Sequence, residues 1–83
     1  MEDSFLLESM KDFMDMEYRS TVISLRYRTT KGHEIHIEDI NAPLQRCLGV
    51  AQFTQTLGLP FKSVDAVYQT YKELFEQLRN KYL

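Results

Sequence analysis

The apolar residues at the N-terminal end of the chain follow the period of an α-helix. They recur at steps of three and four residues: Leu6, Met10, Phe13, Met14 and Tyr18. This spacing places all five on one face of a helix, and acidic residues early in the segment suit the positive end of the helix dipole. The pattern therefore predicts an amphipathic helix over residues 3–18, capped by Asp3 or Ser4.

The pattern then changes from a helical period to alternation. Apolar and polar residues alternate along 21–28 and again along 33–39, which is the period of a half-buried β-strand. Pairing apolar residues across the two strands leaves residues 30–32 as the loop, with Gly32 at its left-handed position. The sequence thus predicts an antiparallel hairpin. Because a lone hairpin is marginal in water, we expect it to pack on the helices or to pair with a second chain.

The second half of the chain returns to a helical pattern. Residues 41–48 and 50–57 are interpreted as two short helices that end at Gly49 and Gly58, or as one bent helix. A long C-terminal helix is predicted over residues 64–82, where apolar residues keep steps of three and four for five turns: Val64, Val67, Tyr68, Tyr71, Leu74, Phe75, Leu78 and Tyr82.

These elements predict an α+β fold. We expect an N-terminal amphipathic helix, a two-stranded antiparallel hairpin, one or two short helices and a long C-terminal helix that covers the hairpin. A chain of 83 residues, 43% of them hydrophobic, is long enough for one core and too short for two. Residues 1–83 are therefore interpreted as a single domain.

Charge and cysteine content narrow the functional classes. The net charge of -2 argues against a protein that holds nucleic acid mainly by bulk positive charge. Cys47 is the only cysteine, so an intramolecular disulfide is excluded and a reducing compartment is expected. No apolar run approaches the ~20 residues of a membrane helix, and no signal peptide is recognisable at the N-terminus. We expect a cytoplasmic protein without membrane association.

No residue cluster has the spacing of a catalytic or metal site. His33 and His36 would point to opposite faces of a strand, which is unsuitable for shared metal ligation. Cys47 lies among apolar neighbours and lacks an adjacent base. Glycine-rich phosphate loops and nucleophile motifs are absent from the sequence. We therefore expect no catalytic residues, no metal and no cofactor.

Residues 50–69 contain one pattern typical of a known motif. It consists of Phe53, Leu57, Gly58, Leu59, Val64 and Val67. This pattern resembles the DNA-binding helix-turn-helix, in which a turn glycine and apolar locking residues hold two crossing helices. The resemblance implies that Lys62, Ser63, Ala66 and Gln69 face the major groove. The alternative is that the apolar residues only bury the junction between two helices.

The first helix carries more apolar surface than a small core requires. The candidate partner-binding residues are Phe5, Leu7, Met10, Met14 and Met16, and methionine is well suited to adaptable docking surfaces. The favoured function is that of a small intracellular regulatory or inhibitory protein, without enzymatic activity, that docks onto a protein partner and forms a homodimer. The alternative is a small helix-turn-helix transcriptional regulator that binds DNA.

Overall fold

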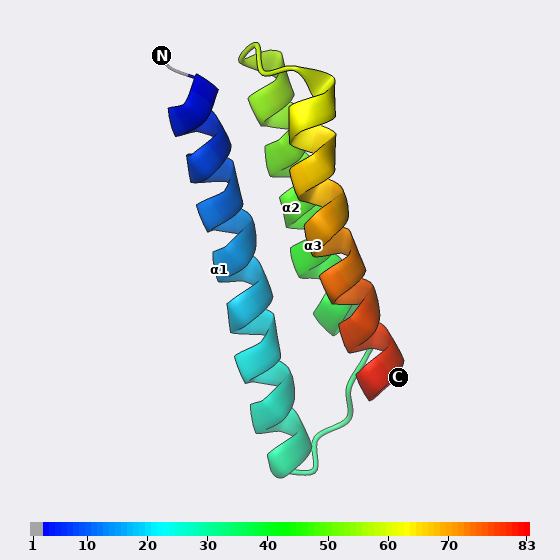
Figure 1. Ribbon diagram of the computed structural model, residues 1–83. Helices are drawn as coiled ribbons and strands as arrows, with labels where there is room; N and C mark the ends of the chain where they lie inside the picture. Colours follow the sequence, from blue (N-terminus) through cyan, green and yellow to red (C-terminus); the bar gives the residue numbers. More distant parts are fainter. Residues whose placement is uncertain (1–2) are drawn as a thin grey trace.

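The computed structural model describes residues 3–83 and shows a bundle of three helices, with no strand in that part of the chain (Figure 1). α1 spans Asp3–Thr30, α2 spans Glu38–Thr56 and α3 spans Phe61–Tyr82. Consecutive helices run antiparallel, so the α2–α3 turn lies at the same end of the bundle as the start of α1. The predicted α+β fold is wrong, because the protein is all-α.

The predicted hairpin over 21–28 and 33–39 is the source of this error. The first segment is the C-terminal part of α1, and the second is a connection followed by the start of α2. The left-handed conformation predicted for Gly32 is confirmed by its φ of 74°, but this residue ends a helix and does not close a hairpin. Its amide donates to the Thr29 carbonyl at 3.1 Å, and the His33 amide donates to the Arg28 carbonyl at 2.8 Å. These two bonds form a Schellman motif.

The alternation along 21–28 arises because α1 is apolar on two opposite faces. Leu25 is fully buried, whereas Ile23 and Tyr27 are exposed on the far side of the helix. No glycine or proline occurs between residues 3 and 31. A helix that has begun therefore extends through the β-branched residues at a cost of roughly half a kcal/mol each. Cooperative extension outweighs the local strand pattern.

α2 is a single helix, so the one-helix alternative is confirmed and the division at Gly49 is wrong. Gly49 does not adopt a positive φ. The helix begins three residues before Asn41, which places Pro43 inside it. Proline lacks the amide that would bond to the Asp39 carbonyl, and this loss falls in the second turn of the helix. The predicted end at Gly58 is confirmed, since Gly58 has a φ of 106° just after the last turn.

The predicted C-terminal helix is confirmed. α3 starts directly after Pro60, three residues before the predicted start at Val64. Its apolar residues face the bundle: Val64, Phe75 and Leu78 are buried. Phe75 is completely buried, and the Tyr18 ring of α1 packs edge-on against it with the ring centroids 5.6 Å apart.

The core lies along the axis of the bundle and draws on all three helices. Its buried members are Met10, Met14, Leu25, Ile40, Cys47, Ala51, Leu59, Val64, Phe75 and Leu78. Within residues 3–83, none of the helices combines the length and the apolar character needed to cross a lipid bilayer.

Polar contacts fix the rotation of α1 about its own axis. Glu17 is only 8% exposed and accepts two hydrogen bonds from Arg46 of α2, from Nε at 2.6 Å and from Nη2 at 3.1 Å. The Tyr71 hydroxyl of α3 donates to the Asp15 carboxylate at 3.4 Å. These contacts turn one face of α1 inward and leave the opposite face in solvent.

Candidate docking surface on the first helix

The outward face of α1 carries four large apolar side chains that the bundle leaves exposed. Phe5, Met16, Ile23 and Tyr27 have exposed fractions of 62%, 54%, 69% and 59%. At 3.6 residues per turn, the four positions fall within about 40° of one another around the helix axis. We call these four residues the outer stripe. It lies on the opposite side of α1 from the buried Met14.

Of the five residues predicted to bind a partner, two are exposed on the outer face of α1 and three are buried or half-buried. Phe5 and Met16 belong to the outer stripe. Met10 and Met14 are 2% and 0% exposed, so they are core residues on the inner face and are not accessible to a partner. Leu7 is half-buried and packs against the core. The two buried methionines fill gaps between the helices, which is the commoner use of this residue.

Sequence reasoning missed Ile23 and Tyr27. The alternation along 21–28 predicts that both lie on the apolar face of a strand, together with Leu25. The signal that identifies them is the absence of a helix breaker before Gly32. If the helix continues, the steps from Met16 to Ile23 and from Ile23 to Tyr27 are two turns and one turn, which aligns the three side chains.

Charged residues along one edge of the outer stripe are divided by sign. Glu8 and Asp12 are exposed in the N-terminal half of α1, and Arg19 and Arg26 are exposed in its C-terminal half. These four positions also fall within about 40° of one another around the axis. Arg19 donates to Asp15 at 2.7 Å, an exposed ion pair one turn apart. The edge is therefore acidic at one end and basic at the other.

A second exposed apolar region lies at the α2–α3 turn. Phe53, Leu57 and Phe61 have exposed fractions of 63%, 50% and 61%. Phe61 borders a groove of about 150 Å³ between α2 and α3, which Leu48 and Tyr68 also line. Phe61 is nearly as exposed as Ile23 but belongs to a different helix, which makes it a matched reference for tests of the outer stripe.

The residues predicted to contact DNA lie together on α3. Lys62, Ala66 and Gln69 are exposed and Ser63 is half-buried. The Gln69 amide donates to the Asp65 carboxylate at 3.3 Å. All of these residues lie near the N-terminal end of α3, next to the α2–α3 turn.

The arrangement of α2 and α3 differs from a helix-turn-helix. That motif crosses its two helices at roughly 90–120°. With 19 and 22 residues, α2 and α3 are about 28 and 33 Å long, whereas the two shorter dimensions of the molecule are 17 and 15 Å. Both helices must therefore run along the long axis of 46 Å, as Figure 1 shows. They form an antiparallel pair, so the sequence resemblance does not extend to geometry.

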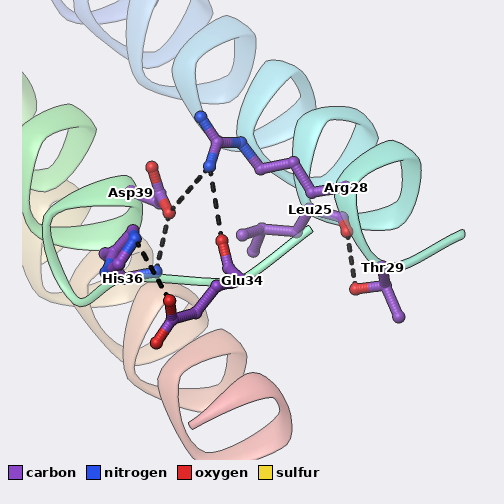
Figure 2. A network of polar contacts seen from close by, with 6 residues as sticks. All are labelled: Leu25, Arg28, Thr29, Glu34, His36 and Asp39. Carbon is purple, nitrogen blue, oxygen red and sulfur yellow. Dashed lines mark hydrogen bonds and ion pairs between the residues drawn. The ribbon is translucent and has the colours of Figure 1, made fainter. Parts of the chain in front are cut away.

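A polar network holds the connection between α1 and α2 (Figure 2). Arg28 Nη1 lies 3.5 Å from both the Glu34 carbonyl oxygen and the Asp39 carboxylate. The same carboxylate accepts a hydrogen bond at 2.8 Å from the amide of His36, which lies just before the start of α2. Figure 2 shows the His36 ring beside the Glu34 side chain, with 3.9 Å between Nε2 and Oε2. In the part of the chain described, no three metal-ligating side chains gather in one place.

Cys47 lies in the core between α1 and α3. Burial raises the pKa of its thiol to about 11, from an ordinary value of 9.0. The thiol is therefore protonated at neutral pH, and its side chain is completely inaccessible to solvent. A nucleophilic cysteine requires an accessible thiolate, which this environment disfavours.

Comparison with protein-family models, curated proteins and solved structures found no significant match to this chain. The function proposed below therefore rests on the fold and on the chemistry of its surfaces.

Proposed function

We propose that this protein acts without catalysis, as a small intracellular regulator or inhibitor that docks onto another protein through the outer stripe of α1. The proposal is carried by the row of four large apolar side chains exposed on a helix whose opposite face is already packed. Single exposed apolar residues are ordinary, but an aligned row of them is typical of a recognition surface.

The dimensions of the row suit a helical partner. The outer stripe extends from Phe5 to Tyr27, which corresponds to about 33 Å along the helix axis. Helix-to-helix recognition uses apolar residues at steps of three, four and seven. Phe, Tyr and Met are also enriched in the central parts of protein interfaces. A helix laid along α1 would bury the row and keep the charged edge at its rim.

A reducing, cytoplasmic location agrees with this proposal. The only cysteine is free and buried, and small proteins of oxidising compartments usually depend on disulfides for stability. The outer stripe needs no disulfide or metal to hold its shape, because the packed inner face of α1 fixes it.

The proposal is tested by affinity capture from extracts of the native host with the tagged full-length chain and two variants. Ile23→Asp places a charge in the outer stripe, and Phe61→Asp makes the same change at a similarly exposed position on α3. We expect the wild type and Phe61→Asp to retain the same protein, and Ile23→Asp to lose it. Circular dichroism must show equal helix content for all three chains. Equal capture by Ile23→Asp would refute the proposal.

A further inference from the structure

The outer stripe and its charged edge share one centre along α1. Met16 lies midway between Phe5 and Tyr27 in the sequence. Turning α1 end for end about Met16 therefore exchanges the two aromatic residues. The same rotation brings Glu8 within two residues of the position of Arg26, a displacement of about 3 Å along the axis.

The other edge pair obeys the same relation. Rotation about Met16 brings Asp12 within one residue of the position of Arg19, or about 1.5 Å. It also places Ile23 opposite Ser9, which is exposed and small enough to leave room for a larger side chain. Apolar, charged and small positions are thus all matched by a single two-fold rotation.

Resting on the proposed function above, we infer that the protein that binds the outer stripe is a second copy of this chain, with the two α1 helices antiparallel. A two-fold interface requires a surface that is complementary to itself. In the antiparallel orientation, the acidic half of each α1 edge meets the basic half of the other. In a parallel two-fold dimer the two charged edges would lie on opposite sides of the interface, so Glu8 would not meet Arg26 and these attractive contacts would be lost.

The pairing is tested first by sedimentation equilibrium of the full-length chain. We expect a dimer at about 100 µM protein, a concentration at which even weak specific interfaces are populated. Ile23→Asp introduces two buried charges into each dimer and should raise the dissociation constant by roughly 100-fold or more. Phe61→Asp should leave it unchanged. A monomeric wild type, or a dimer that Ile23→Asp does not weaken, would overturn the inference.

The orientation is tested by reversing charges at two exposed positions. Glu8→Arg and Arg26→Glu should each weaken self-association roughly ten-fold, because each replaces two attractive contacts per dimer with two repulsive ones. An equimolar mixture of the two variants should recover the wild-type affinity, since every cross-chain pair is then attractive again. In a parallel dimer neither single reversal would weaken association, so that result would refute the antiparallel arrangement.

The two experiments separate this inference from the proposed function. If the wild type is monomeric but capture still depends on Ile23, the outer stripe binds a different protein and only the second-copy inference fails. If the wild type is monomeric and capture does not depend on Ile23, both fail. A dimer that responds to Ile23→Asp and to charge reversal supports the second-copy inference, and the proposed function is supported only where capture also depends on Ile23.

Discussion

The ion pair between Glu17 and Arg46 leads to the most specific prediction about stability. Glu17 is 8% exposed, and Arg46 provides both hydrogen bonds to its carboxylate. The Glu17 carboxylate also raises the pKa of the Arg46 guanidinium. Arg46→Ala would leave a nearly buried carboxylate without its donors, whereas Glu17→Met would leave an arginine whose side chain is 56% exposed and able to return to water. The two substitutions should therefore have unequal costs.

The magnitudes follow from the burial of each partner. Breaking a buried pair costs about 3–5 kcal/mol. Because Arg46 is more than half exposed, water reaches the site, and we expect about 2–3 kcal/mol for Arg46→Ala. Glu17→Met adds an apolar side chain beside Met10 and Met14, so the expected change is within about 1 kcal/mol of zero. In the Glu17→Met background, Arg46→Ala should cost only about 0.5 kcal/mol, which gives a coupling energy of about 2 kcal/mol.

The assay compares the wild type, the two single variants and the double variant. Circular dichroism monitors their unfolding by urea and by heat, all at the same protein concentration. For a domain of this size, Arg46→Ala should lower Tm by roughly 10–20 °C, and Glu17→Met should change it by less than about 8 °C. The reasoning is refuted if Glu17→Met costs as much as Arg46→Ala. That result would mean that the carboxylate itself, and not its pairing, stabilises the contact between α1 and α2.

Three further predictions concern single positions. Of Gly49 and Gly32, only Gly32 has a positive φ, and a Cβ added at either would meet no atom. Gly49→Ala should therefore stabilise the protein by about 1 kcal/mol, and Gly32→Ala should destabilise it by about 1 kcal/mol, both measured by urea unfolding. The pKa of the folded Cys47 thiol is raised to about 11. Burial of the neutral thiol therefore contributes fully to stability below about pH 9, and up to about 2–3 kcal/mol of stability is lost as pH rises from about 9 to about 11. Cys47→Ala should remove this loss from the pH profile of stability. Asp39→Ala deletes the acceptor for Arg28 and for the His36 amide and should cost about 1 kcal/mol, with faster hydrogen exchange at that amide.

The extent to which the sequence predicts the fold depends on how completely each core face is apolar. α3 was predictable because its inward positions from Val64 to Leu78 are nearly all apolar. α1 was predictable only as far as Tyr18. From there on the apolar period is interrupted, because the polar residues Glu17 and Thr21 occupy buried positions on either side of Tyr18. Glu17 is paired with Arg46, 29 residues away, and no local pattern reveals a partner at that distance.

Only part of the candidate site could be predicted from the sequence, because the sequence does not show which apolar face of α1 is buried. Phe5 and Met16 stand off the main apolar face in sequence, so they could be recognised as surplus. The choice between the two apolar faces of α1 could not be made in the same way, because Met10 and Met14 suit a docking surface as well as they suit a core. Only the positions of α2 and α3 decide which face is buried.

The same feature of α1 therefore accounts for the error in the fold and for the proposed function. A helix that is apolar on two faces shows alternation wherever inner and outer residues interleave, as Ile23, Leu25 and Tyr27 do. A strand would have placed these three side chains on one side and buried them together. The helix instead buries Leu25 and exposes the other two. Because the bundle is complete without them, the exposed residues of α1 contribute little to the stability of one chain and are free to contribute to binding a second.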